Sequence, residues 1–199
     1  MLTGDVMVRS RLAYKLLDLA EATTGSFRSG FGSSTVLGCG FFACISGSDA
    51  ADAAAIGRIT MDRLVERGYP KPYACALVAS GACTGILIPP SISYIIIGLV
   101  LGISSTTLFT AAIIPGLLIL FGVLLTNALV NRFSGYEHSR ERFSWRRWFR
   151  TLNDAKWAIL FPVFLIVGIR FGIFTPTEAG AFCVLYALII GLFVYREMT

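Results

Sequence analysis

Apolar runs of membrane-spanning length constrain this chain more than any other feature of its sequence. A helix needs about 20 mostly apolar residues to cross the hydrocarbon core of a bilayer. The runs 73–101 and 106–131 are each long enough, and the shorter runs 157–169 and 179–195 follow. Only 15% of the 199 residues are charged, whereas soluble domains carry about 25%. The sequence therefore predicts an all-α polytopic membrane protein and argues against a soluble enzyme.

Positive charge is concentrated in three segments that flank the apolar runs, at 9–28, 58–71 and 132–156. Basic segments of this kind face the cytoplasm in membrane proteins. We therefore expect a lipid bilayer as partner and no nucleic acid, which would need a basic soluble module. Two crossings separate the second segment from the third. A single crossing at 30–57 would place the first segment on the opposite side, so the topology favours a re-entrant hairpin there, which enters and leaves by the same face.

The chain offers little of the chemistry that enzymes use. Its five cysteines lie in apolar stretches without paired metal-ligand spacing, its one histidine, His138, lies in a charged loop, and it has no phosphate-binding loop for ATP. An intramembrane hydrolase that uses Ser46, or the pair Asp49 and Asp52, is a competing hypothesis. The apolar segments contain no histidine to act as its base. We therefore expect no enzyme activity and no cofactor.

The first interruption of the apolar pattern is the sequence ISGSDAADAAAIG at 45–57. Ser46 to Ser48 supply small residues for a tight turn and oxygen atoms that can bind a ligand. Ser48 or Asp49 can cap the helix that follows, because short polar side chains accept hydrogen bonds from the first N–H groups of a helix. Non-helical backbone is tolerated within a membrane only where it is buried in protein or lines a cavity, so this turn predicts a binding site.

The second interruption is the sequence GILIPPS at 85–91. Pro89 and Pro90 lack the N–H group that a helix interior needs. The carbonyls four residues earlier, on Gly85 and Ile86, therefore lose their helical partners. In secondary transporters, unwound carbonyls hold a hard cation such as Na⁺, and the N-termini of half-helices face anionic groups of the substrate. Two such interruptions facing one another predict an ion and substrate site.

The same motifs carry a family resemblance. ISGSDAADAAAIG is followed by RGYPKPYACALVASGACTGILIPPS at 67–91 and later by GIFTPTEAGA and GLFVYRE at 172–181 and 191–197. In this order they resemble the large membrane subunit, the DctM-like subunit, of tripartite ATP-independent periplasmic (TRAP) transporters over nearly the whole chain. The resemblance implies an elevator-type, ion-transporter-like fold of inverted repeats, with a re-entrant hairpin and a broken helix in the first repeat and an incomplete second repeat.

The resemblance assigns a role to each segment in chain order. These are an interfacial arm helix at 1–29, a re-entrant hairpin at 30–57, a cytoplasmic loop at 58–72, a broken transmembrane helix with the following span at 73–131, a basic cytoplasmic or interfacial loop at 132–156, and two transmembrane segments at 157–199. The family has scaffold helices before this arm and a second hairpin and broken helix after it, so we expect half of the translocation machinery to lie outside this chain. A non-transporting membrane remnant is the remaining alternative.

The resemblance also implies a function, that of a multi-pass permease subunit in the bacterial inner membrane. Such a subunit imports small acidic solutes, for example dicarboxylates, by Na⁺ symport. It receives them from a periplasmic solute-binding protein and works with a small membrane subunit. Asp49 departs from the family, in which a small or hydroxyl residue is more usual, so its carboxylate adds a cation ligand or repels an anionic substrate. The implied site residues are Ser46, Ser48 and the carbonyls of Gly85, Ile88 and Pro90 for Na⁺, and Ser48, Asp49 and Ser91 for the substrate.

Overall fold

The computed structural model describes residues 12–25, 29–137 and 144–171, together with six single residues, 173, 178, 182, 185, 186 and 189. Every regular element in this described part is helical, as the sequence predicts. Residues 1–11 and most of the predicted run 179–195 lie outside it. The elements are α2 Leu12–Thr24, α3 Gly30–Ser46, α4 Asp49–Glu66, α5 Lys71–Ala82, the 3₁₀ turn η1 Cys83–Gly85, α6 Ile92–Leu101, α7 Ser105–Ser134 and α8 Trp145–Arg170.

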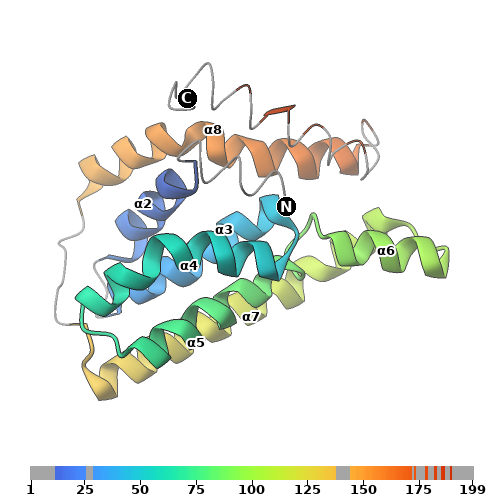
Figure 1. The fold of residues 1–199 in the computed structure, drawn as a ribbon. Helices are drawn as coiled ribbons and strands as arrows, with labels where there is room; N and C mark the ends of the chain where they lie inside the picture. The colour runs from blue at the N-terminus through green and yellow to red at the C-terminus, as the bar shows by residue number, and fades with distance from the viewer. Residues whose placement is uncertain are drawn as a thin grey trace.

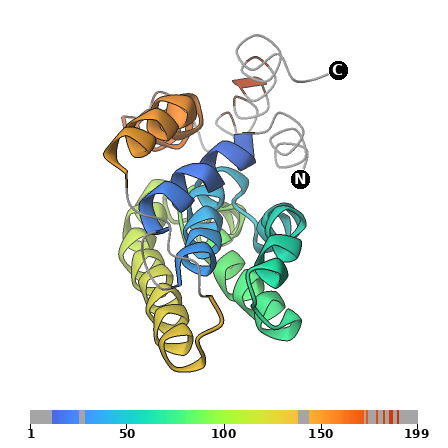
Figure 2. The same ribbon diagram turned by 90° about the vertical axis from the view of Figure 1, so that its left-hand side faces the viewer.

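Helix α3 lies at the centre of the molecule (Figure 1). Helix α4 folds back antiparallel to it, α2 and α8 cover one side, and α5 and α7 cover the other (Figure 2). Most residues of α3 are buried, and many of them are glycine, serine, alanine or cysteine. Small side chains let neighbouring helices approach closely. At Gly32, for example, an added Cβ would lie 2.6 Å from the Tyr69 hydroxyl.

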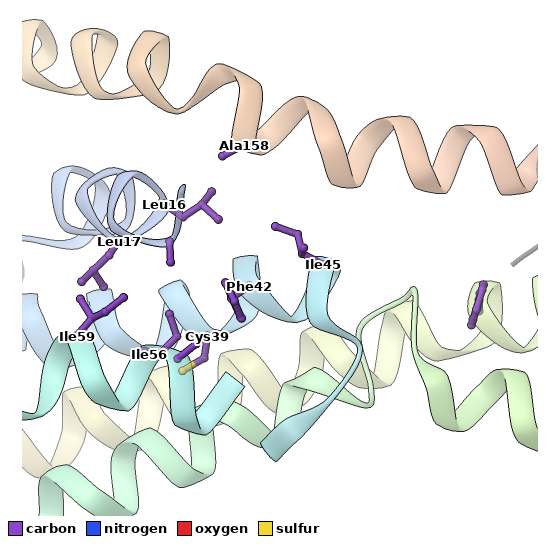
Figure 3. Packing of buried hydrophobic residues seen from close by; sticks show 11 residues of the cluster. Leu16, Leu17, Cys39, Phe42, Ile45, Ile56, Ile59 and Ala158 are labelled. Carbon is purple, nitrogen blue, oxygen red and sulfur yellow. The ribbon is translucent and has the colours of Figure 1, made fainter. Parts of the chain in front are cut away.

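The main hydrophobic core lies where α2, α3, α4 and α8 meet (Figure 3). Its members include Leu16, Leu17, Cys39, Phe42, Ile45, Ile56, Ile59 and Ala158. A second cluster packs nearer the start of α3 and joins α3 to α4 and α5. Its members are Phe31, Val36, Leu64, Tyr69, Ala74, Leu77 and Val78. The hairpin formed by α3 and α4 is therefore held along its length by apolar packing.

Helix α7 is the described helix that is long and apolar enough to cross a bilayer, with a mean hydropathy of 2.6 over its most apolar stretch. Its 30 residues span about 45 Å at 1.5 Å per residue. Large apolar side chains are exposed along it and at the end of α6, where Leu99 and Val100 are 76% and 77% exposed. An apolar face of this size marks a surface that contacts lipid or another protein.

The structure differs from two predicted boundaries. Helix α4 continues to Glu66, so the loop expected at 58–72 is confined to the few residues before α5. Helix α8 begins at Trp145 and runs without a break through the boundary expected at 156, so the last part of the predicted basic loop and the following span are one helix. The reason is the same in both cases: arginine and lysine are good helix formers, and positive charge alone does not end a helix.

Candidate functional site

The turn between α3 and α4 lies where the sequence predicts it. Gly47 has φ 59° and ψ 22°, a left-handed conformation that glycine adopts without the steric cost of a Cβ. Its N–H donates to the Ala43 carbonyl at 3.2 Å and so ends α3. Ser48 is extended, and α4 begins at Asp49. The N-terminus of α4 therefore opens at the tip of the hairpin.

The break between α5 and α6 forms the other half of the site. Helix α5 ends at Ala82, η1 adds one tight turn to Gly85, and regular helix resumes at Ile92. Two consecutive prolines account for the gap, because neither supplies an N–H group to a helix. The N-termini of α4 and α6 carry partial positive charge, and the C-termini of α3 and η1 carry partial negative charge. The turn and the break therefore present partial charges of both signs.

The hairpin tip and the break are in direct contact. The Ile92 N–H donates to the Gly47 carbonyl at 3.4 Å. A Cβ added at Gly47 would lie 2.7 Å from the Pro90 carbonyl oxygen, and one added at Gly85 would lie 2.6 Å from the Asp52 Oδ2 atom. Any side chain at either glycine would push the two segments apart. The two glycines are therefore required by the contact itself.

Polar side chains of the tip organise this contact. The Ser46 hydroxyl donates to the Asp52 Oδ1 atom and accepts a hydrogen bond from the Ser48 N–H at 3.2 Å. The Ile86 N–H of the break donates to the Asp49 Oδ1 atom at 2.7 Å. The expected capping of α4 by the Ser48 side chain is not observed. Asp49 is instead a bridge between the tip and the break.

Two buried oxygen atoms at the contact, Asp52 Oδ2 and Ser91 Oγ, lack hydrogen-bond partners among the residues that the structure describes. Asp52 is 0% exposed and Ser91 is 1% exposed. The ion pairs found in the described part of the chain do not include Asp52. Burying an unpaired carboxylate costs several kcal/mol. The donor set of carboxylate, hydroxyl and carbonyl oxygens fits a small hard cation, which would remove this cost.

Most of the residues predicted to bind Na⁺ or substrate lie at or beside this contact. The Ile88 side chain lies against α7, 3.2 Å from where a Cβ at Gly116 would be, whereas the predicted ligand is its backbone carbonyl. The binding roles of all these residues stay predictions. Sequence reasoning names Asp52 only for the hydrolase hypothesis and does not assign it to the ion site. The available signal is an acidic residue inside an apolar hairpin, because an ionisable residue at membrane depth is by default a candidate for a functional site.

A chain whose described elements are all helical, and whose hairpin tip meets a proline-broken helix, has the features of a secondary transporter. Comparison with known families identifies the particular one. Residues 1–199 match the family model described as tripartite ATP-independent periplasmic transporter, DctM component. The chain belongs to this family.

Relatives with several named solutes are similar to the chain. It is 39% identical to the ectoine/5-hydroxyectoine TRAP transporter large permease protein UehC of Ruegeria pomeroyi, over 98% of this chain and 46% of that protein. It is 37% identical to the isethionate TRAP transporter permease protein DctMQ of Oleidesulfovibrio alaskensis, over 98% and 31%. It is 36% identical to the C4-dicarboxylate TRAP transporter large permease protein DctM of Pseudomonas aeruginosa, over 100% and 46%. The chain therefore spans less than half the length of these relatives.

Proposed function

We propose that this chain forms part of a Na⁺-coupled permease that imports a small organic acid across the bacterial inner membrane. The buried carboxylate of Asp52 carries this proposal, because no described residue gives its Oδ2 atom a hydrogen bond at the contact between the hairpin tip and the break. Na⁺ bound beside this oxygen supplies the missing positive charge. The Ser91 hydroxyl and the Pro90 carbonyl are further oxygen ligands at the same contact, and the Ser46 hydroxyl keeps a lone pair for the ion.

Cation binding at this contact gives a physical basis for coupling. An ion held by atoms of both segments stabilises the contact between the tip and the break. The bound cation also reduces the net negative charge of the site. The N-termini of α4 and α6 then favour an anionic group nearby. Affinity for the ion and affinity for the substrate are therefore linked, and by thermodynamic reciprocity each raises the other by the same factor.

The substrate is proposed only as a small organic acid, with dicarboxylates as the first class to test. The relatives carry the names of C4-dicarboxylate, isethionate and ectoine transporters, so family membership alone does not choose among these solutes. We assign substrate contact to Ser48 and Ser91. Asp49 accepts the Ile86 N–H, so part of its charge is already compensated and its repulsion of an anion is reduced.

The partners proposed for the complete transporter are a small membrane subunit and a periplasmic solute-binding protein. Family membership supports both. The exposed apolar faces of α6 and α7 are suited to lipid or to a membrane partner, and the membership supports a multi-pass protein of the inner membrane. In this arrangement the hairpin is re-entrant, with its open end on the cytoplasmic side.

The test is solute uptake by the complete permease, reconstituted with both partners in liposomes. We expect uptake of one of the three solute classes with an inward Na⁺ gradient and none with an equal K⁺ gradient. Asp52→Asn should abolish the Na⁺ stimulation. Asp62→Asn is the matched control, because Asp62 lies on the same helix but is exposed. Equal uptake in Na⁺ and K⁺, or equal stimulation in both variants, would contradict the proposal.

The same experiment addresses the two alternatives. A non-transporting remnant predicts no uptake of any solute under either gradient. An intramembrane hydrolase would need a base beside Ser46, and the described residues at the site include acids but no histidine; His138 lies outside the described part of the chain. No observation at the site favours either alternative over transport.

A further inference from the structure

A buried network of charged and polar groups lies at the open end of the hairpin, far from the ion site. It consists of Glu21 on α2, Phe31 at the start of α3, Arg67 and Tyr69 between α4 and α5, and Glu137 after α7; we call it the basal network. In Figure 1 the ends of α4 and α7 and the starts of α3 and α5 all lie on the same side of the molecule. The network therefore joins segments that are distant in sequence.

Glu137 is the centre of the basal network. Its two carboxylate oxygens accept the Phe31 N–H at 3.1 and 3.0 Å. The Tyr69 hydroxyl donates to its Oε2 atom at 3.0 Å. The first N–H groups of a helix lack partners within the helix, and a carboxylate at this end also interacts favourably with the helix dipole. Glu137 thus caps α3 from a position 106 residues away.

Arg67 supplies the positive charge of the network. Its guanidinium contacts Glu21 at 2.6 Å and Glu137 at 3.4 Å, and these carboxylate side chains are only 4% and 1% exposed. The same guanidinium lies over the Phe31 ring, 4.5 Å from the ring centre. Burial, and then the charge of Glu137, raise the pKa of Tyr69 above its usual range, so its hydroxyl stays protonated and donates. One cation and several donors therefore fix the Glu137 carboxylate.

The loop that carries Glu137 is itself fixed to α7. The Glu137 N–H donates to the side chain of Asn131 at 3.0 Å. One turn earlier on the same helix, the Asn127 amide donates to Ser33 of α3 at 3.2 Å. The backbone of Glu137 is therefore bonded to α7, and its carboxylate is bonded to the first turn of α3. Glu137 in this way fixes the start of α3 relative to α7.

The hairpin tip is far from the basal network, so a small change in the orientation of α3 at its start moves the tip appreciably. Phe31 and Ser46 lie at opposite ends of α3, about 23 Å apart at 1.5 Å per residue. A tilt of about 3° at the base would therefore move the tip by about 1 Å. The tip tolerates little displacement, since it meets the break through the two glycines and the bridge from Asp49 to Ile86. Fixing the start of α3 therefore keeps the proposed ion ligands of the tip aligned with those of the break.

We propose that Glu137 is a positioning residue, which holds the hairpin tip in register with the broken helix by fixing the start of α3. This inference rests on the proposed function, because the register matters for Na⁺ binding. Glu137 touches neither ion nor substrate, so its loss should change the affinity for Na⁺ while leaving the maximal rate of the assembled transporter little changed.

The test compares Glu137→Gln with Glu66→Gln in the complete permease. Glutamine at 137 keeps the shape of the side chain but loses its charge. Its NH₂ group is a donor and cannot accept the N–H and O–H hydrogen bonds that the carboxylate accepts. Glu66 lies next to Arg67 and is exposed, so it is the matched control. We expect the Na⁺ concentration for half-maximal uptake to rise about fivefold or more in Glu137→Gln and to be unchanged in Glu66→Gln. Glu137→Asp, which keeps the charge, should show an intermediate rise.

A second readout does not depend on transport. Cys39 of α3 is fully buried, and its sulfur lies 3.2 Å from where a Cβ at Gly81 of α5 would be. With Cys39 as the sole cysteine, its reaction with N-ethylmaleimide should be slow in the parent and in Glu66→Gln and faster in Glu137→Gln, because the hairpin separates from α5 more often.

The outcomes separate the two proposals. Faster labelling together with a raised half-saturating Na⁺ concentration supports the positioning role. Unchanged labelling in Glu137→Gln overturns it, and so does a fall in maximal rate with unchanged Na⁺ dependence. If Glu137→Gln does not fold, Tyr69→Phe, which removes one hydrogen bond and no charge, must show a smaller shift in the same direction. Absence of Na⁺ dependence in the parent itself would overturn the proposed function, and the positioning role for the ion site with it.

Discussion

Replacing Gly85 by alanine gives the sharpest perturbation of the ion site. The added Cβ would lie 2.6 Å from the Asp52 Oδ2 atom and 3.0 Å from both the Asp49 nitrogen and the Ser48 carbonyl carbon. Real Cβ atoms do not approach other atoms at the shortest of these distances, and two of the three neighbours are backbone atoms that cannot rotate away. Gly85 is not among the glycines with positive φ, so the cost comes from crowding and not from backbone strain.

The magnitude follows from the cost of overpacking a well-packed site, about 1–3 kcal/mol for an added methyl group. The methyl group also occupies the space beside the oxygen atom that we assign to the ion. If the whole cost falls on the ion-bound state, the half-saturating Na⁺ concentration rises about 5- to 150-fold. We would measure it by Na⁺ titration of uptake by the complete permease, at equal amounts of folded protein.

Gly122→Ala is the matched control, because a Cβ at Gly122 of α7 meets no atom of the described residues within 4 Å. Alanine is the better helix former by about 1 kcal/mol, so this variant should be as stable as the parent or more stable, with unchanged Na⁺ dependence. An identical Na⁺ titration for Gly85→Ala and Gly122→Ala would refute the reasoning, since the space beside Asp52 would then have no part in ion binding.

Three further predictions concern the hairpin. Ser46→Ala leaves the buried Asp52 carboxylate without its donor, which costs about 1–3 kcal/mol; thermal unfolding should show a lower midpoint, and an unchanged one would contradict the hydrogen bond. Asp49→Ser should weaken Na⁺ dependence more than Asp49→Asn, because serine is too short to accept the Ile86 N–H, whereas the asparagine oxygen can still accept it. Equal effects of the two variants in Na⁺ titrations would mean that Asp49 only caps α4. Single cysteines at positions 28, 63 and 142, one in each basic segment, should all be protected from an impermeant thiol reagent added outside. Labelling at position 63 but not at position 28 would exclude the re-entrant hairpin.

The sequence predicts the tip and the break well because glycine and proline leave direct local signals. A glycine between two serines marks a turn that needs positive φ, and two prolines remove consecutive N–H donors. Both features lie in the structure at the residues where the sequence places them. The contact between the two features was expected from their pairing, whereas the bridge from Asp49 to Ile86 joins residues 37 apart and has no periodic signature.

Other parts of the structure have no local signal at all. Basic residues at 58–71 favour a loop, but Arg58 and Arg63 are exposed on α4, and Leu64 of the same helix is buried. The basal network depends on Glu137 and Arg67, which are 70 residues apart. An acidic residue in a basic loop is usually solvated, and only the packing of α7 against α3 shows that Glu137 is buried. Tertiary contacts of this kind cannot be predicted from the pattern of one sequence.

The central claim is that the contact between the hairpin tip and the broken helix binds Na⁺ through Asp52. Equilibrium binding of radioactive sodium to the purified complete permease tests it most directly, since the measurement needs neither substrate nor partner proteins. The parent and Asp62→Asn should bind Na⁺ with equal affinity, and Asp52→Asn should bind it at least about tenfold more weakly, because a charge-assisted contact is worth about 1.5–3 kcal/mol. Equal Na⁺ binding by all three proteins would contradict the account.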